Sequence, residues 1–207
     1  MPALFTERLK LFSKPENRPL LTGLQRGIEK ESLRISPEGR LAQTPHPQAL
    51  GSALTHPSIT TDFSEALMEL ITPVSNSVDQ TLSCLDDVHR FVYHNLGDEK
   101  LWTTSMPCVL AGEEQIPVAL YGSSNVAQMK TVYRHGLGNR YGRAMQTIAG
   151  IHYNFSLPIS MWERLQQADN DQQTPQDYIT NAYFGMIRNF RRTSWLLVYL
   201  FGASPAV

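Results

Sequence analysis

The chain has 207 residues, with 18 Lys and Arg against 19 Asp and Glu, which gives a formal net charge of −1. This length suffices for one domain with a substantial core, and the near-neutral charge offers no basic field to nucleic acid or an anionic membrane. The two cysteines, Cys84 and Cys108, lack metal-site spacing and form no disulfide framework, so a reducing cytoplasmic setting is expected. No signal peptide or membrane span is predicted, because the longest apolar run, Trp195 to Phe201, is far shorter than about 20 residues.

The N-terminal part of the chain predicts a helix, a loop and a strand. Apolar residues near helical spacing indicate a short amphipathic helix over residues 2 to 13, and a proline-containing loop follows it. Residues 23 to 35 are favoured as a β-strand. Residues 36 to 39 have turn-forming side chains, so residues 40 to 44 could return as a hairpin partner of that strand.

The predicted strand carries the first candidate site. In an extended chain, Glu29 and Glu31 leave the same face, roughly 7 Å apart, and Gln25 and Gly27 share that face. Two carboxylates at this spacing can bind one divalent cation, or two cations a few ångströms apart. The alternative is an exposed strand on which Glu and Lys side chains are simply solvated, since the opposite face is not a clean apolar row.

A second acidic segment runs from Ile59 to Pro73. Its β-branched opening favours a strand, whereas the composition of residues 64 to 70 leaves a helix open as an alternative. In an extended chain, Glu65 and Glu69 lie on one face, and Asp62 has the opposite parity, so Asp62 can join Glu69 only through a bend or bulge. The segment contains no Lys or Arg. Its carboxylates must therefore be exposed, protonated or bound to a cation.

Two helices are predicted in the middle of the chain. Residues 77 to 96 form the clearest helix, with a capping box made by Ser77 and Gln80, and we interpret this helix as scaffold. Residues 121 to 125 read as a loop that enters a second helix, which carries Lys130, Tyr133 and Arg134 and is broken by the glycines that follow. No glycine pattern matches a phosphate-binding P-loop.

Residues 144 to 157 show the cleanest alternation in the sequence and predict a long strand. One face is nearly all apolar, which indicates contact with a core. The other face consists of Gln146, Ile148, Gly150, His152, Asn154 and Ser156. Neutral hydrogen-bonding groups around a glycine suit the floor of a binding site. An edge strand in water is the alternative.

The C-terminal part is predicted to be helical. Residues 160 to 166 form a short helix with a capping box, and Thr174 caps a longer helix that begins with Pro175. The apolar segment that follows leads into a Ser-Pro turn near residue 204, so the sequence looks like a chain cut short. Because strands and helices are interleaved without a βαβ rhythm, we expect a single α+β domain over residues 1 to 207, with an antiparallel sheet, helices on one face and the site on the other.

Several of these segments together resemble one family. The runs Leu24–Arg34, Gly51–His56, Ile59–Glu69, Gly150–Ser156 and Phe201–Pro205 are similar to those of proteobacterial glutamate–cysteine ligases, also called γ-glutamylcysteine synthetases. The resemblance covers nearly the whole chain from residue 20 onward. Chains of that family are more than twice as long, so this sequence resembles their N-terminal part only.

The resemblance implies a glutamine-synthetase-like catalytic fold, here incomplete, in which a curved antiparallel sheet holds ATP, divalent cations and amino acids on its concave face. It also implies a reaction in which ATP phosphorylates the γ-carboxylate of glutamate and the amine of cysteine displaces phosphate, the first step of glutathione synthesis. Mg²⁺ or Mn²⁺ would be the cation and ATP the co-substrate, because phosphoryl transfer needs a metal that neutralises the phosphates. The family implies a monomer for the full-length protein.

The resemblance also assigns residues. Glu29, Glu31, Asp62 and Glu69 would be magnesium ligands, and Gln25 with Glu29 would contact the nucleotide. Tyr133 would lie near the cysteine site, and the glutamate site would be lined by Gln146, Ile148 and Asn154, with His152 beside them.

Two other functions remain open from the sequence. The chain could be an inactive binding module that keeps part of the glutamate and Mg-ATP site, or another carboxylate–amine ligase of the same fold. Since the later part of the family's chains supplies further site residues, we expect weak or no activity from the 207-residue chain alone.

Overall fold

The computed structural model describes residues 2–202, which fall into two compact units. One unit is the continuous segment 25–156, and the other combines residues up to 24 with those from 157 onward. The predicted Ser-Pro turn near residue 204 lies outside the described residues. The single domain predicted from the sequence stays a prediction, because a division into compact units does not test it.

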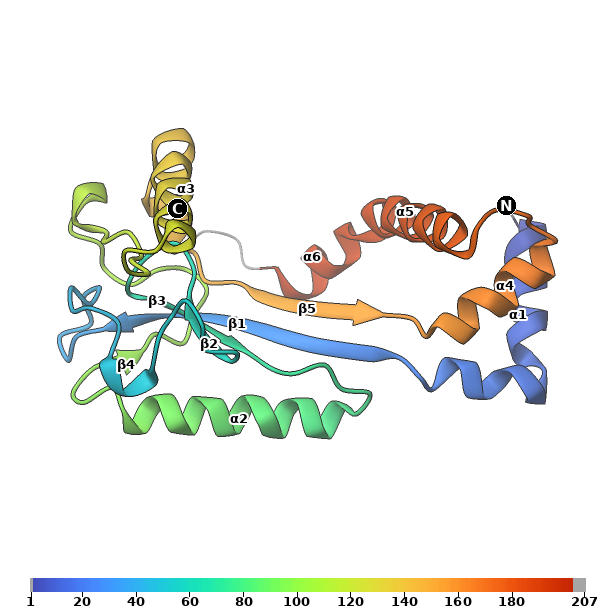
Figure 1. Cartoon of the computed structure of the whole chain (residues 1–207), viewed down its shortest axis with the longest axis horizontal. Helices are drawn as coiled ribbons and strands as arrows, with labels where there is room; N and C mark the ends of the chain where they lie inside the picture. Colours follow the sequence, from blue (N-terminus) through green and yellow to red (C-terminus); the bar gives the residue numbers. More distant parts are fainter. Residues whose placement is uncertain (1, 203–207) are drawn as a thin grey trace. The chain divides into compact units, whose positions relative to one another are not determined.

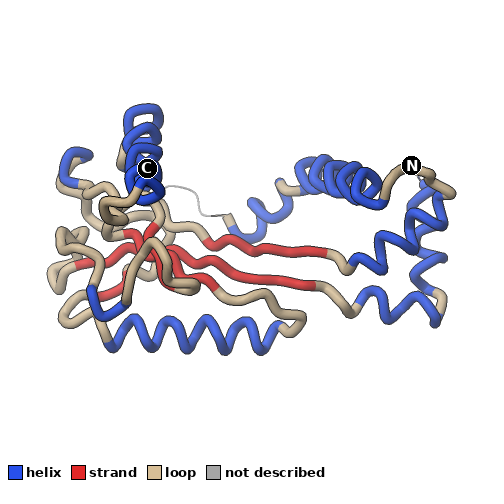
Figure 2. The backbone as a smooth tube through the Cα atoms, viewed as in Figure 1, coloured by secondary structure: helices blue, strands red, loops and turns tan. Residues whose placement is uncertain are grey.

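The 25–156 unit is built around an open antiparallel sheet (Figures 1 and 2). Its strands are β1 (Gln25–Ile35), β2 (Ile59–Thr61), β3 (Leu67–Ile71), β4 (Lys100–Leu101) and β5 (Ile151–Ser156). The long strand β1 is central: β3 pairs along one of its edges, and β5 and β4 pair with the two ends of the other edge. Strand β2 pairs with the outer edge of β3.

The two faces of β1 differ in chemistry, and α2 (Val78–His94) covers one of them (Figure 1). On that face Lys30 and Ser32 are paired with Leu70 and Met68 of β3. Both β3 residues belong to a buried apolar cluster that also contains Val92 of α2. Half of the predicted capping box is present: Ser77 accepts a hydrogen bond from the Gln80 N–H, but the Ser77 N–H donates to Ser75 Oγ and not to the Gln80 side chain. One face of the sheet is therefore filled by apolar side chains and a helix.

The opposite face of β1 is apolar only at its C-terminal end. There Leu33 and Ile35 join a cluster that includes Leu67 and Phe63. Helix α3 (Asn125–Tyr141) packs beside this end, because a Cβ on Gly138 would lie 3.3 Å from the Phe63 ring. The sequence predicts helices on one face only, and α3 departs from that prediction. It also continues through Gly136 and Gly138 and ends at Gly142.

The long strand predicted over residues 144–157 is wrong in its first half. Residues Ala144–Thr147 form the 3-10 helix η4, and β5 begins only at Ile151. Local bonds explain the difference: Thr147 is fully buried and its hydroxyl donates to Ala144 O at 2.6 Å, while Ala149 N–H donates to Ser105 O at 2.9 Å. The backbone before residue 150 therefore has partners other than β1.

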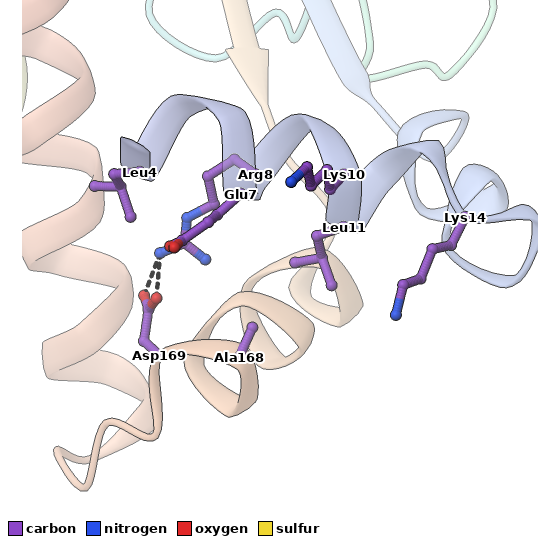
Figure 3. Close-up of a pocket in the computed structure, with 8 residues that line it drawn as sticks. All are labelled: Leu4, Glu7, Arg8, Lys10, Leu11, Lys14, Ala168 and Asp169. Atoms are coloured by element: carbon purple, nitrogen blue, oxygen red, sulfur yellow. Dashed lines mark hydrogen bonds and ion pairs between the residues drawn. The ribbon is translucent and has the colours of Figure 1, made fainter. Parts of the chain in front are cut away.

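The other unit contains helices. They are α1 (Pro2–Ser13), the 3-10 helix η1 (Pro15–Leu21), α4 (Ile159–Asp169), α5 (Pro175–Thr193) and α6 (Trp195–Phe201). Trp162 and Tyr178 form the centre of its apolar cluster. Figure 3 shows the cavity between α1 and α4, where Arg8 binds both carboxylate oxygens of Asp169. Asp169 also accepts from the Tyr178 hydroxyl at 2.6 Å, so one carboxylate ties three helices together.

Of the two helix caps predicted in this unit, one is present and the other is not. Thr174 caps α5 through the Asp177 N–H, as predicted, whereas α4 starts after Pro158 without a side-chain cap. Among the described residues, no helix is both long enough and apolar enough to cross a membrane.

Candidate functional site

The polar half of the open sheet face carries acidic side chains from neighbouring strands. Glu31 of β1 is directly opposite Glu69 of β3, which in turn is opposite Thr60 of β2. Two residues before Glu31 on the same face of β1, Glu29 is opposite His152 of β5. Residues directly opposite each other in an antiparallel pair point to the same face, with Cβ atoms about 4.5–5.5 Å apart. The register therefore brings the predicted Glu29/Glu31 pair together with Glu69.

Strand β5 and Gly150, which directly precedes it, supply hydrogen-bond donors to both carboxylates of β1. Glu31 accepts from the Gly150 N–H at 2.6 Å through Oε2, and its Oε1 lies 3.1 Å from Nε2 of His152. Asn154 donates through its amide nitrogen to Oε1 of Glu29 at 2.8 Å. These bonds orient the two glutamates and place His152 and Asn154, both predicted from the sequence, beside them.

Gly150 has a steric reason to be glycine. A Cβ at this position would lie 3.2 Å from Nε2 of His152 and 3.4 Å from Oε2 of Glu31. The His152 ring would have to shift by a few tenths of an ångström, whereas the contact with Glu31 would be an ordinary one. The alternation of the sequence marks this glycine as part of the floor, but its bond to Glu31 follows only from the pairing of β1 with β5.

Asp62 reaches the same face through a reversal of the chain. Residues 62–66 form the connection between β2 and β3, and the Asp62 N–H donates to Leu67 O at 3.0 Å. Asp62 therefore follows Thr60 on the site face, diagonal to Glu69. This hairpin is the bend that Asp62 needs in order to lie on the same face as Glu69. The helical alternative for residues 64–70 is wrong.

Glu65 has a structural role in the same connection. It is buried, and its carboxylate accepts from the backbone N–H groups of His46 at 2.9 Å and Leu120 at 2.8 Å. The sequence groups Glu65 with Glu69 on one strand face, and this grouping is wrong because the strand starts only at Leu67. These two bonds satisfy the buried Glu65 carboxylate, so it does not need a cation.

Glu69 has the electrostatic environment of a cation ligand. Burial first, and then the nearby carboxylates of Asp62, Glu29 and Glu31, together raise its pKa to about 7, against a lowering by His152. In the described part of the chain, none of these four carboxylates forms an ion pair with Lys or Arg. A half-buried carboxylate that is repelled by its neighbours favours either a proton or a bound cation.

The donor set fits a hard divalent cation such as Mg²⁺ in chemistry, because it consists of carboxylate oxygens. As the side chains stand in residues 2–202, no three His, Cys, Asp or Glu groups are arranged as a complete metal centre. Glu29 and Glu31 direct oxygens toward donors on β5. Mg²⁺ binds through one or two carboxylates together with phosphate oxygens and water, so a complete protein cage is not required.

The remaining predicted residues lie away from the carboxylates. Gln25 begins β1 and lines, with Gly27 and Asn154, a cavity of about 150 Å³ at the end of the sheet. Gln146 lies in η4, Ile148 directly follows it, and Tyr133 is exposed on α3. Within the described residues, neither Gln146 nor Tyr133 forms a side-chain hydrogen bond with Glu29, Glu31 or Glu69. Their roles as substrate contacts stay predictions.

The raised pKa of Glu69 predicts that the metal-free chain loses stability as pH rises from about 4.5 to about 7. In this range the folded state holds a proton that the unfolded state has released, so the free energy of unfolding falls, by about 1–2 kcal/mol after allowance for solvent screening. Chelator-treated Glu69→Gln should lack this fall. Thermal unfolding between pH 5 and 8 tests it, with the exposed Glu114→Gln as control; parallel curves for Glu69→Gln and wild type would contradict the prediction.

The fold and the site together define a class of protein. An open antiparallel sheet with a half-buried carboxylate cluster on its free face suits enzymes that bind Mg²⁺ with phosphate-bearing substrates. Two solved structures share this fold. Francisella tularensis glutamate–cysteine ligase in complex with AMP aligns with a TM-score of 0.81 and 44% identity over 88% of this chain and 36% of that one. A bifunctional glutathione synthetase from Pasteurella multocida aligns with a TM-score of 0.82 and 35% identity, over 91% and 24%.

Sequence relatives identify the family. The glutamate-cysteine ligase family model matches residues 9–207. Glutamate–cysteine ligase of Alcanivorax borkumensis is 59% identical over 97% of this chain, and that of Pseudomonas putida is 58% identical over all of it. The chain belongs to the glutamate–cysteine ligase family. It spans 38–39% of the length of these relatives.

Proposed function

We propose that this chain carries the magnesium-binding side of a glutamate–cysteine ligase site. In the complete protein this site would join the γ-carboxylate of glutamate to the amine of cysteine with conversion of ATP to ADP and phosphate. The observation that carries the proposal is the carboxylate cluster on the free face of the sheet, in which Glu69 is half-buried and repelled by its acidic neighbours. Family membership supports the choice of this reaction.

The proposed reaction has two steps. An oxygen of the glutamate γ-carboxylate attacks the γ-phosphorus of ATP, which releases ADP and leaves γ-glutamyl phosphate. The cysteine amine then attacks the acyl carbon, phosphate leaves, and the nitrogen loses a proton as the amide forms. Mg²⁺ or Mn²⁺, when bound, supplies positive charge that neutralises the phosphates. Glu29, Glu31, Asp62 and Glu69 are the residues that would hold it.

The chain's own residues would organise the acidic side chains. Gly150 and Asn154 fix the carboxylates of Glu31 and Glu29 through hydrogen bonds, and His152 lies at contact distance from Glu31. We assign Gln25 and Glu29 to the nucleotide, and the AMP complex of the Francisella tularensis relative supports nucleotide binding in general, not these two residues. We assign to the amino-acid substrates the side chains of Tyr133, Gln146, Ile148, His152 and Asn154. Because the reaction needs cysteine as a free thiol, we place the protein in the reducing cytoplasm.

The test is ADP release by the full-length protein with Mg²⁺. We expect release only when both glutamate and cysteine are present, and poor turnover by the 207-residue chain alone, since it spans 38–39% of the length of its relatives. ATP hydrolysis indifferent to both amino acids would contradict the proposal. Ligand binding without turnover would instead identify a binding module, and activity with another amine would identify a different carboxylate–amine ligase.

A further inference from the structure

The connection that carries Asp62 is held from outside the sheet by two side chains. Arg134 of α3 donates through Nε to the backbone carbonyl of Asp62. Tyr121 donates its hydroxyl to Thr61 O at 2.7 Å, and the same hydroxyl accepts from Oγ1 of Thr61 at 3.1 Å. The backbone carbonyls of Thr61 and Asp62, where β2 ends, therefore accept from donors that lie 60 and 72 positions later in the chain.

Tyr121 and Arg134 also support each other. The guanidinium carbon of Arg134 lies 4.7 Å from the centre of the Tyr121 ring, and the Lys130 ammonium lies 5.0 Å from it. Arg134 is fixed at its own helix as well, because its Nη1 donates to Lys130 O at 3.0 Å. The Tyr121 ring is buried, and burial raises the pKa of its hydroxyl, so the hydroxyl stays a donor at neutral pH.

The Asp62 carboxylate depends on this support for its position. No hydrogen bond to that carboxylate is present within residues 2–202, so the backbone of the connection alone places it. Strand pairing places it on the face of Glu69, because Asp62 lies two residues after Thr60, which is opposite Glu69 in the β2–β3 pair. A change in the backbone at residues 61 and 62 would move one carboxylate of the cluster and leave Glu31 and Glu69, which are held by strand pairing, in place.

We propose that Tyr121 and Arg134 are positioning residues that hold the Asp62 carboxylate beside Glu69 and thereby set the affinity of the site for its divalent cation. The inference rests on the proposed function, in which Asp62 and Glu69 bind that cation. In this proposal neither side chain is a ligand of the cation. They act through the backbone of residues 61 and 62, in the way that groups behind a metal ligand tune its affinity.

The test is Mn²⁺ binding by the full-length protein, followed through the electron paramagnetic resonance signal of free Mn²⁺. Arg134→Met removes the bond to Asp62 O, and Tyr121→Phe removes the hydroxyl but keeps the ring. We expect each to weaken Mn²⁺ binding, by about 10-fold for Arg134→Met. In assays the Mg²⁺ concentration for half-maximal activity should rise, while kcat at saturating Mg²⁺ stays near that of wild type. Lys130→Met is the matched control, because it removes a cation above the same ring without breaking a bond to the connection.

Unchanged Mn²⁺ affinity in both Arg134→Met and Tyr121→Phe would overturn the inference and leave the proposed function standing. An equal loss in Lys130→Met would overturn it too, since the effect would then follow from charge near the ring. A wild-type protein that binds no Mn²⁺ would overturn the metal assignment itself. If Arg134→Met fails to fold, Tyr121→Phe decides the outcome, because it deletes a single hydroxyl from a ring that keeps its packing.

Discussion

Glu31→Gln should reduce ligase activity of the full-length protein by about 100-fold or more while leaving the fold intact. Glutamine keeps the length of the side chain and a carbonyl oxygen that can accept the hydrogen bond from the Gly150 N–H. It removes the negative charge that a divalent cation requires. The substitution therefore separates the role of the charge from the role of the hydrogen bond.

The stability of Glu31→Gln should move in the opposite direction from its activity. Glu31 is one of the carboxylates that raise the pKa of Glu69, so its neutralisation relieves repulsion in the metal-free protein. We expect the melting temperature in chelator to be equal to or above that of wild type, and the increase in melting temperature on addition of Mg²⁺ to be lost. Glu38→Gln, on an exposed turn after the same strand, is the control. Activity above a tenth of wild type would contradict the assignment of Glu31.

Local sequence patterns were sufficient for parts of the site that lie on one strand. Period-2 alternation places Glu29 and Glu31 on one face of β1, because successive strand residues always point to opposite faces. The same rule places His152 and Asn154 together on β5. The pairing of these two strands was not predictable from either segment alone, since register depends on contacts between residues more than 100 positions apart.

The position of Asp62 shows what alternation cannot resolve. Counted along one strand, Asp62 and Glu69 fall on opposite faces, and only the reversal between β2 and β3 brings them to the same face. The turn signals in residues 62–66 are limited to Asp62 and Ser64, because the segment contains no Gly, Pro or Asn. Its bend is held by local bonds from the Ala66 and Leu67 N–H groups to Ser64, and also by donors from Tyr121 and Arg134, which lie far along the chain.

In the segment 144–157, alternation predicted a longer strand and a core contact that the structure does not show. Its alternation is regular, yet its first four residues form a 3-10 helix, and the apolar side chains of β5 are exposed in the described part of the chain. Ile151, Tyr153 and Phe155 are 67%, 60% and 42% exposed, respectively, so the predicted apolar face does not contact a core there. Alternation records which side chains share a face, but burial depends on what packs against that face.

Arg34→Met should cost about 3–5 kcal/mol of folding free energy, the largest stability effect expected in the 25–156 unit. The Arg34 side chain is fully buried, and its Nη1 donates to Glu99 Oε2 and Thr44 Oγ1, each at 2.6 Å. Its Nη2 donates to Thr44 O at 2.8 Å and to Glu65 O at 3.1 Å. Removal of the guanidinium leaves the largely buried Glu99 carboxylate and the Glu65 carbonyl without these partners, whereas the exposed Thr44 can bind water.

A double substitution distinguishes loss of the ion pair from loss of packing. Arg34→Met with Glu99→Leu removes both charges, and replacement of a buried pair by apolar side chains is often close to neutral. We therefore expect the double variant to be more stable than Arg34→Met alone in urea unfolding of the 25–156 unit within its chain. Arg34→Lys should not rescue, since an ammonium cannot reproduce the planar set of four bonds. Equal stability of the single and double variants would contradict this expectation and show that Arg34 stabilises the unit by packing and not through its pair with Glu99.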